Sequence, residues 1–276
     1  MIAGLGLAIG SAALINLGFL LQHRGLSGLD ADSRLRGAVR SRQWLAGQGL
    51  GIVGFAAQVT ALALAPLALV QAFAAGGLAL SLPLAAGLFG QRVERSQALA
   101  VLAIAGALAV LPLGTGANRD VLDALSLGSI VAGLLLAGLL AFRTRVPTLM
   151  AIAAGLLYGA TDASLKAVAV LWRDDGAGAL LSVWPALALV GTAAGFLCFQ
   201  AALREGGAVS SVTLMTGSAA LVALGCGVLA LGERFGNGPL VTAGHLLAVG
   251  VVLICVRPLA AGQAALVDSL DASRER

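Results

Sequence analysis

Charged side chains are scarce in this sequence. Asp, Glu, Lys and Arg together make up 11% of its 276 residues, whereas a soluble domain carries about 25%. Apolar residues account for 59% of the chain, and the mean hydropathy is +0.98. A soluble protein of this length could bury a core but could not hide this much apolar surface. The composition therefore excludes a soluble globular protein and predicts a polytopic membrane protein. Its spans should be helices, because lipid offers the backbone no hydrogen bonds.

Cysteine and histidine are rare as well, and they are not grouped. The three cysteines, Cys198, Cys226 and Cys255, fall inside predicted helices, so they indicate neither a disulfide framework nor a metal site. Of the two histidines, His23 lies in a predicted loop and His245 has no pair of acidic residues near it in the sequence. Metalloprotease, serine-hydrolase and phosphate-binding motifs are absent. The sequence therefore predicts a protein that is not an enzyme and that carries no cofactor.

What the chain does have is a repeated layout of apolar segments. The chain has nine apolar segments of about 20 residues, and each is long enough to cross a ~30 Å hydrocarbon core as a helix. They lie at roughly 2–22, 44–65, 67–90, 97–113, 125–142, 148–171, 181–203, 208–232 and 238–257. The third and the eighth align at an offset of 142 residues, which places Gly90-Gln91-Arg92 on Gly232-Glu233-Arg234. Because an odd number of crossings separates equivalent helices, the last four should run opposite to the first four.

The expected fold class is an all-α polytopic membrane protein, with about nine transmembrane helices in two inverted four-helix repeats joined by a linker helix, as in secondary transporters. The predicted divisions are a first repeat at 1–114, the linker helix and its loops at 115–147, a second repeat at 148–257 and a cytoplasmic tail at 258–276. Prolines support these boundaries: we expect Pro66, Pro147 and Pro239 at helix starts, Pro112 and Pro258 at helix ends, and Pro83 inside the third helix.

Arginine is distributed unevenly between the predicted loops. Thirteen arginines fall on one side and three, Arg119, Arg173 and Arg234, fall on the other. The positive-inside rule makes the arginine-rich side cytoplasmic, so we expect an outside N-terminus and a cytoplasmic C-terminus in the cell (inner or plasma) membrane. The basic run at 34–42 follows acidic residues and contains no aromatic residue. It indicates contact with anionic lipid headgroups rather than with nucleic acid.

Four stretches of the chain carry a resemblance to a known family. They are Gly4–Ala8 with Gln22–Leu26, Ala63–Val70, Ala163–Lys166 and Ala230–Arg234. In this order they resemble the NIPA-like family of the drug/metabolite transporter (EamA-like) superfamily. The first repeat departs from the family's Gly-Glu helix ending, because it has Gln91 in place of the glutamate. The resemblance implies a transporter, with magnesium or another divalent cation as the NIPA-type substrate and small organic solutes elsewhere in the superfamily.

The sixth predicted helix carries the charged residues that we expect to be most important for function. Asp162 is the only acidic residue inside the predicted helices, and Lys166, one turn later, is the only lysine of the chain. Their i,i+4 spacing favours an ion pair on one helix face, and Tyr158 extends this stripe by one turn. Charges at membrane depth are costly and usually functional. We therefore predict that the pair is the centre of a transport pathway and that Asp162 exchanges a proton. The alternative for Lys166 is that its long side chain snorkels to the membrane surface.

Depth within the membrane suggests which other polar groups belong to the site. Counted from the segment middles at ~1.5 Å per residue, Asp162, His245 and Gln58 lie within ~4–5 Å of the midplane on the same side. The alternative without a function is that His245 and Gln58 form hydrogen bonds only with neighbouring backbone groups. The remaining predicted pathway residues are neutral and intramembrane: Asn16, Gln71 and Thr213.

The sequence leaves three functions open. The favoured one is a transporter that moves a small polar solute by alternating access, with proton coupling as an option. A NIPA-like magnesium transporter is the alternative, with Asp162 as the metal ligand, although Lys166 beside it is a poor neighbour for a second cation. A membrane subunit that transports nothing is the third. The expected partners are the lipid bilayer and the small-molecule or cation substrate.

Overall fold

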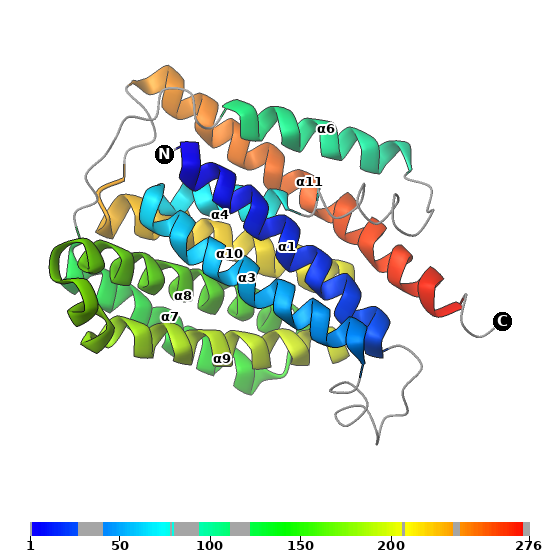
Figure 1. Ribbon diagram of the computed structural model, residues 1–276, viewed down its shortest axis with the longest axis horizontal. Helices are drawn as coiled ribbons and strands as arrows, with labels where there is room; N and C mark the ends of the chain where they lie inside the picture. Colours follow the sequence, from blue (N-terminus) through cyan, green and yellow to red (C-terminus); the bar gives the residue numbers. More distant parts are fainter. Residues whose placement is uncertain are drawn as a thin grey trace.

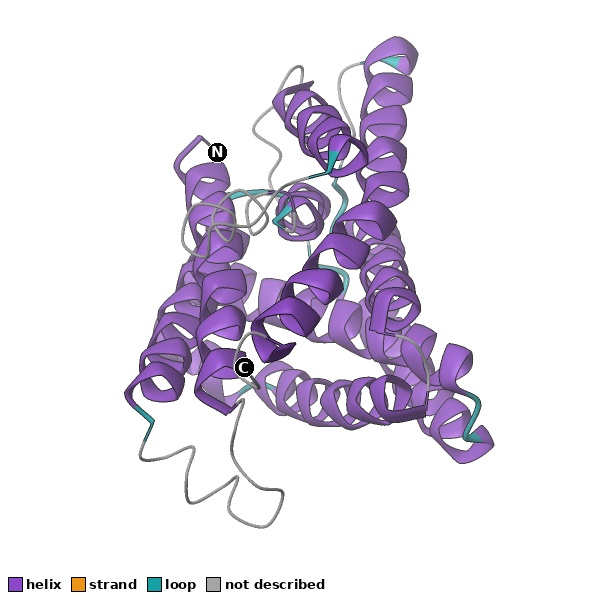
Figure 2. Ribbon diagram, turned by 90° about the vertical axis from the view of Figure 1, so that its right-hand side faces the viewer, coloured by secondary structure: helices purple, strands orange, loops and turns teal. Residues whose placement is uncertain are grey.

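The protein is almost entirely helical. The computed structural model describes residues 2–26, 41–77, 79, 94–110, 122–205, 208–233 and 238–272. Within these ranges the helices are α1 (Ile2–Leu26), α3 (Arg42–Leu64), α4 (Leu67–Gly76), α6 (Arg95–Val110), α7 (Ala124–Thr144), α8 (Pro147–Asp175), the 3₁₀ helix η1 (Gly176–Leu181), α9 (Val183–Glu205), α10 (Ala208–Ala230) and α11 (Pro239–Ala272). Figure 2 shows helices joined by short loops throughout this part of the chain. The predicted all-α architecture is confirmed for these residues.

Six helices of the described part are long and apolar enough to cross a membrane. They are α3, α7, α8 together with η1, α9, α10 and α11. Shorter apolar helical stretches lie at Ala3–Gly18, Leu67–Gly76 and Arg95–Val110. The protein is therefore a multi-pass membrane protein, as its composition predicts. The third predicted segment, 67–90, is described as a continuous helix only over α4. Residues Pro83, Gly90, Gln91 and Pro112 lie outside the described part of the chain.

Three prolines stand at helix starts, as the sequence predicts, and a fourth does not end a helix as predicted. Pro66 is the N-cap residue of α4. Pro147 and Pro239 are the first residues of α8 and α11, where a missing N–H leaves no helical bond unmade. The predicted helix end at Pro258 is wrong, because α11 continues through Pro258 to Ala272. Proline inside a helix costs about 3 kcal/mol. Val256 and Leu259, on either side of it, are fully buried in the core, where they pack by van der Waals contact with neighbouring helices.

Helix α8 lies at the centre of the second half of the chain. It packs against α7, α9 and α10, and it also contacts α3 and α4 of the first half. Figure 1 shows α8 between α9 on one side and α10 on the other, with the α1–α3 pair crossing nearby and α6 and α11 together at the opposite edge. More than half of the residues of α8 are buried. Side chains on α8 are thus positioned by helices from both halves.

Glycines bring two helix pairs into close contact. In the α1–α3 pair, a Cβ atom on Gly18 would lie 2.7 Å from the carbonyl oxygen of Gly47. In the α8–α10 pair, a Cβ atom on Gly155 would lie 2.1 Å from the carbonyl oxygen of Met215. Membrane helices approach this closely only through small residues. The two pairs are therefore tightly packed units, and the contact between α3 and α8 joins them.

Candidate functional site

A stripe of buried polar residues follows one side of α8. Asp162 is 9% exposed and Lys166 is 0% exposed, one turn further along the helix. Helix α8 runs unbroken past this stripe from Pro147 to Asp175, and alanine, the strongest helix former, is the most frequent residue on its buried side. Two ionisable side chains are consequently fixed inside the helix bundle. Each needs polar partners from neighbouring helices, because burying an unpaired charge is costly.

Asp162 receives its hydrogen bonds from two glutamine amides on other helices. The side-chain amide of Gln58, on α3, donates to Oδ1 at 3.2 Å. The side-chain amide of Gln71, on α4, donates to Oδ2. Gln71 is buried and Gln58 is half-buried. The structure thus brings together three of the residues predicted for the pathway, from three different helices, and both oxygens of the carboxylate have a donor.

Lys166 is held by the backbone at the end of α3. Its Nζ atom donates to the carbonyl oxygens of Leu62 and Ala65, at 2.8 Å each. The side chain is completely buried, so the snorkelling alternative is wrong. Lys166 was expected to pair with Asp162, but the hydrogen bonds described for these two side chains go to separate partners. The ammonium lies instead at a helix C-terminus, where the helix dipole favours positive charge.

The contacts described for Tyr158 and Asn16, two further predicted pathway residues, are with other parts of the protein. The ring of Tyr158 lies against Gly195 of α9, where an added Cβ would be 3.3 Å away. Asn16 donates to the carbonyl of Ala12 within its own helix, at 2.8 Å. Thr213 is half-buried on α10.

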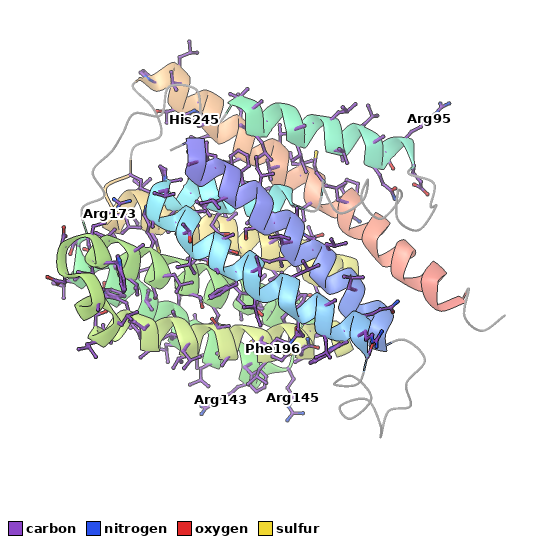
Figure 3. All side chains as sticks on the ribbon, viewed as in Figure 1. Arg95, Arg143, Arg145, Arg173, Phe196 and His245 are labelled. Carbon is purple, nitrogen blue, oxygen red and sulfur yellow. The ribbon has the colours of Figure 1, made fainter. Side chains whose placement is uncertain are left out.

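His245 is buried on α11, a helix that, within the described residues, contacts α4, which carries Gln71, but not α8 or α3. Among the described helices, α11 packs against α6, α10, α4 and α1, and α8 is not one of its neighbours. Figure 3 shows His245 in the α6–α11 part of the molecule. A shared depth in the membrane therefore did not place His245 and Asp162 on facing helices.

Glu233 is the buried charge that the analysis of the sequence missed. It is 4% exposed, and its carboxylate accepts the backbone N–H groups of Leu67 and Ala68, the latter at 3.2 Å. Gly232 ends α10 in a left-handed conformation, with φ +62°, and the N–H of Glu233 bonds back to the carbonyl of Gly227 at 2.8 Å. This turn directs the glutamate onto the start of α4. The Gly-Glu helix ending was the available signal, but nothing in the sequence connects it to a helix 166 residues away.

The side chains around Asp162 interact through hydrogen bonds and charge. Within the described residues, no group of three or more His, Cys, Asp or Glu side chains is arranged to hold a metal ion. The Asp162 group instead combines one carboxylate with two amides, each of which has a donor end and an acceptor end. Such a group can hold a proton, or a polar solute that replaces one of the amides.

Comparison with known proteins finds a similar protein but names no function. An uncharacterized protein of Corynebacterium glutamicum is 28% identical to this chain over 244 residues, which cover 83% of this chain and 84% of that protein. No protein-family model matches the sequence. No solved structure matches it significantly.

Proposed function

We propose that this multi-pass membrane protein is a secondary transporter that moves a small polar solute across the cell membrane by alternating access, with a proton bound and released at Asp162. The observation that carries the proposal is the group of Asp162, Gln58 and Gln71, built from three helices inside the bundle. A charge at membrane depth costs about 2.5–3.5 kcal/mol on insertion scales. A protein that needed only stability could fill this position with an apolar side chain.

The hydrogen bonds of Asp162 suggest how a proton acts there. The ionised carboxylate accepts from both amides, as described above. The protonated acid carries one O–H group, which needs an acceptor, and rotation of one glutamine amide by about 180° presents its carbonyl oxygen. Proton binding thus reverses one of the hydrogen bonds that join α8 to α3 or α4. The proton and a polar solute would then compete for the same amides.

The packing of the helices supports the inverted-repeat part of the proposal. If nine helices cross the membrane, α4 and α10 are the third and eighth, and α6 and α11 are the fourth and ninth. Each of these two pairs packs together, as equivalent helices close to a two-fold axis between the halves would. The start of α1 and the end of α11 lie toward opposite sides of the molecule in Figure 1, in agreement with an odd number of crossings. The resemblance to NIPA-like and EamA-like transporters points in the same direction.

The arginines support the proposed orientation. In Figure 3, Arg173, from the arginine-poor side, and Arg95, from the arginine-rich side, lie at opposite ends of the bundle. The positive-inside rule then puts the end with Arg95 in the cytoplasm.

Magnesium transport is the second candidate, and one observation favours it. A carboxylate with two amide carbonyls, obtained by rotating Gln58 and Gln71, is an oxygen-ligand set of the kind Mg²⁺ accepts. The buried ammonium of Lys166, one turn away, disfavours a divalent cation at the same place.

Flux measurements on proteoliposomes test the proposal. Purified protein is reconstituted with a pH-sensitive dye inside, and amino acids, amines and sugars are added outside, one at a time; Mg²⁺ is tested with a magnesium-sensitive dye. We expect solute-dependent proton movement that Asp162→Asn abolishes and that the matched control Asp123→Asn, at an exposed helix cap, leaves unchanged. Proton-independent uptake of Mg²⁺ would establish the magnesium function instead. Absence of any flux across the panel would favour a non-transporting subunit.

A further inference from the structure

The turn between α3 and α4 is short and lies inside the protein. Only Ala65 and Pro66 separate the two helices. The last carbonyl groups of α3 and the first N–H groups of α4 have no partners within their own helices. Leu62, Ala65, Leu67 and Ala68 are all buried, so water does not readily replace those partners. Pro66 contributes no N–H of its own.

Two buried charges from the second half of the chain supply the missing partners. The ammonium of Lys166 takes the carbonyls of Leu62 and Ala65 at 2.8 Å each. The carboxylate of Glu233 takes the N–H groups of Leu67 and Ala68. Each charge has the sign that the helix dipole favours, positive at the C-terminus of α3 and negative at the N-terminus of α4. We call these two side chains, with the four backbone groups they bind, the α3–α4 clamp.

The clamp lies one helical turn from the Asp162 group on all three helices involved. Gln58 precedes Leu62 by four residues on α3, Gln71 follows Leu67 by four residues on α4, and Asp162 precedes Lys166 by four residues on α8. Four residues of α-helix amount to ~6 Å along the axis. The clamp therefore fixes the ends of the same two helices that carry the glutamine amides.

We propose that Lys166 and Glu233 are positioning residues that hold the α3–α4 turn closed against α8 and α10, and so keep the amides of Gln58 and Gln71 on Asp162. They bind backbone rather than solute. Access to the Asp162 group from this end of the bundle requires the turn to move away from α8 and α10, and that movement breaks the clamp. The purpose of the clamp rests on the proposed transport function, but its closure can be measured without any solute.

Cysteine labelling measures the closure directly. Ala65, in the turn, is buried, and in a background without the native cysteines Ala65→Cys reports exposure of the turn to N-ethylmaleimide in proteoliposomes. A second protein that keeps only the native Cys198, which is buried near α8 in a separate packing cluster, reports exposure elsewhere. Lys166→Met and Glu233→Gln are introduced into both. Arg143→Met and Asp123→Asn, which remove exposed charges, are the controls.

We expect each clamp variant to raise the labelling rate of Ala65→Cys about ten-fold, as for a local opening that no longer breaks buried bonds. The rate at Cys198 should rise by a smaller factor than the rate at Ala65→Cys, because it reflects only the lower stability of the whole fold, and both control variants should stay at the wild-type level. An unchanged rate at Ala65→Cys would overturn the proposal, and so would a parallel rise at Cys198, because the charges would then support the whole fold. A clamp that passes this test in a protein without flux would refute the transport function alone.

Discussion

Two layers of buried polar side chains, one helical turn apart, satisfy their charges in different ways. In the α3–α4 clamp, Lys166 and Glu233 bind backbone groups at fixed positions. In the Asp162 group, the carboxylate binds side-chain amides that can rotate. Each backbone group can act only as a donor or only as an acceptor, whereas a side-chain amide can turn either its N–H or its carbonyl toward a neighbour. The first arrangement is suited to holding a structure, and the second to exchanging a proton or a solute.

The largest effect that separates the layers is expected for Lys166→Met. Methionine fills a similar volume but leaves the carbonyls of Leu62 and Ala65 without their donor. We expect a loss of about 2–4 kcal/mol in the free energy of unfolding, measured by unfolding in mixed micelles. The matched control, Arg143→Met at an exposed position, should change stability little. A stable Lys166→Met protein would show that the ammonium is not structural and would remove the distinction between the layers.

Amide replacements of the two carboxylates should lower the free energy of unfolding by different amounts. Glu233→Gln brings an NH₂ group against fixed backbone donors, so one N–H loses its acceptor, and we expect a loss of about 1–3 kcal/mol. Asp162→Asn meets amides that can rotate to restore its bonds, so we expect less than about 1 kcal/mol, with proton-coupled flux abolished. The same unfolding measurement checks both variants. Equal losses would mean that the glutamines are as fixed as backbone.

A glycine on α10 allows the clamp to be disturbed without changing a charge. A Cβ atom on Gly227 would lie 2.5 Å from Oε2 of Glu233, whereas one on Gly225 would have nothing within 4 Å. Both changes to alanine gain the same helix propensity. We therefore expect Gly227→Ala to be less stable than Gly225→Ala by about 1 kcal/mol, the value of a weakened hydrogen bond. Identical stabilities would show that Glu233 finds an equivalent position.

The smallest effect is expected at Asp123, an exposed carboxylate that caps α7. Hydrogen bonds from the hydroxyl and the backbone N–H of Ser126 hold the pKa of Asp123 below its ordinary value of 3.8. A pKa that is lower in the folded state adds stability above 3.8, and this contribution is lost as the pH falls through the folded value. Asp123→Ala should therefore be slightly less stable than wild type at pH 7 and equal to it in strong acid. A difference independent of pH would mean that the carboxylate charge plays no part in this cap.

The boundaries of individual helices were largely predictable from the sequence. The segment predicted at 125–142 is α7, at 124–144, and the one at 148–171 is the main part of α8, at 147–175. Apolar length and the proline at position 147 carried these predictions, since both act locally. The end of α11 was not predicted, because the helix continues through Pro258 with Val256 and Leu259 packed in the core on either side of it. Tertiary packing decided that boundary.

The candidate site was predictable in part. Polarity at membrane depth identified Asp162, Gln58 and Gln71, and the depth estimate put Gln58 and Asp162 at one level. Depth alone does not state which helices are neighbours, so His245 was grouped with Asp162 and Gln58, although α11 contacts neither α8 nor α3 in the described structure. The sequence also paired Lys166 with the nearest acid along its own helix. Its described partners, the carbonyls of α3, belong to backbone, which no side-chain pattern reports.

The sequence distances across the clamp have a consequence for the order of assembly. The ammonium that α3 needs is 104 residues beyond Leu62, and the carboxylate that α4 needs is 166 residues beyond Leu67. At ~5–20 residues per second of synthesis, the start of α4 waits ~10–30 s for Glu233 to be made. The α1–α3 pair can form early through its glycines, but its junction with α4 is completed only when the last helices arrive. A nascent chain stalled before residue 233 lacks this carboxylate, so the first N–H groups of α4 would be without that partner.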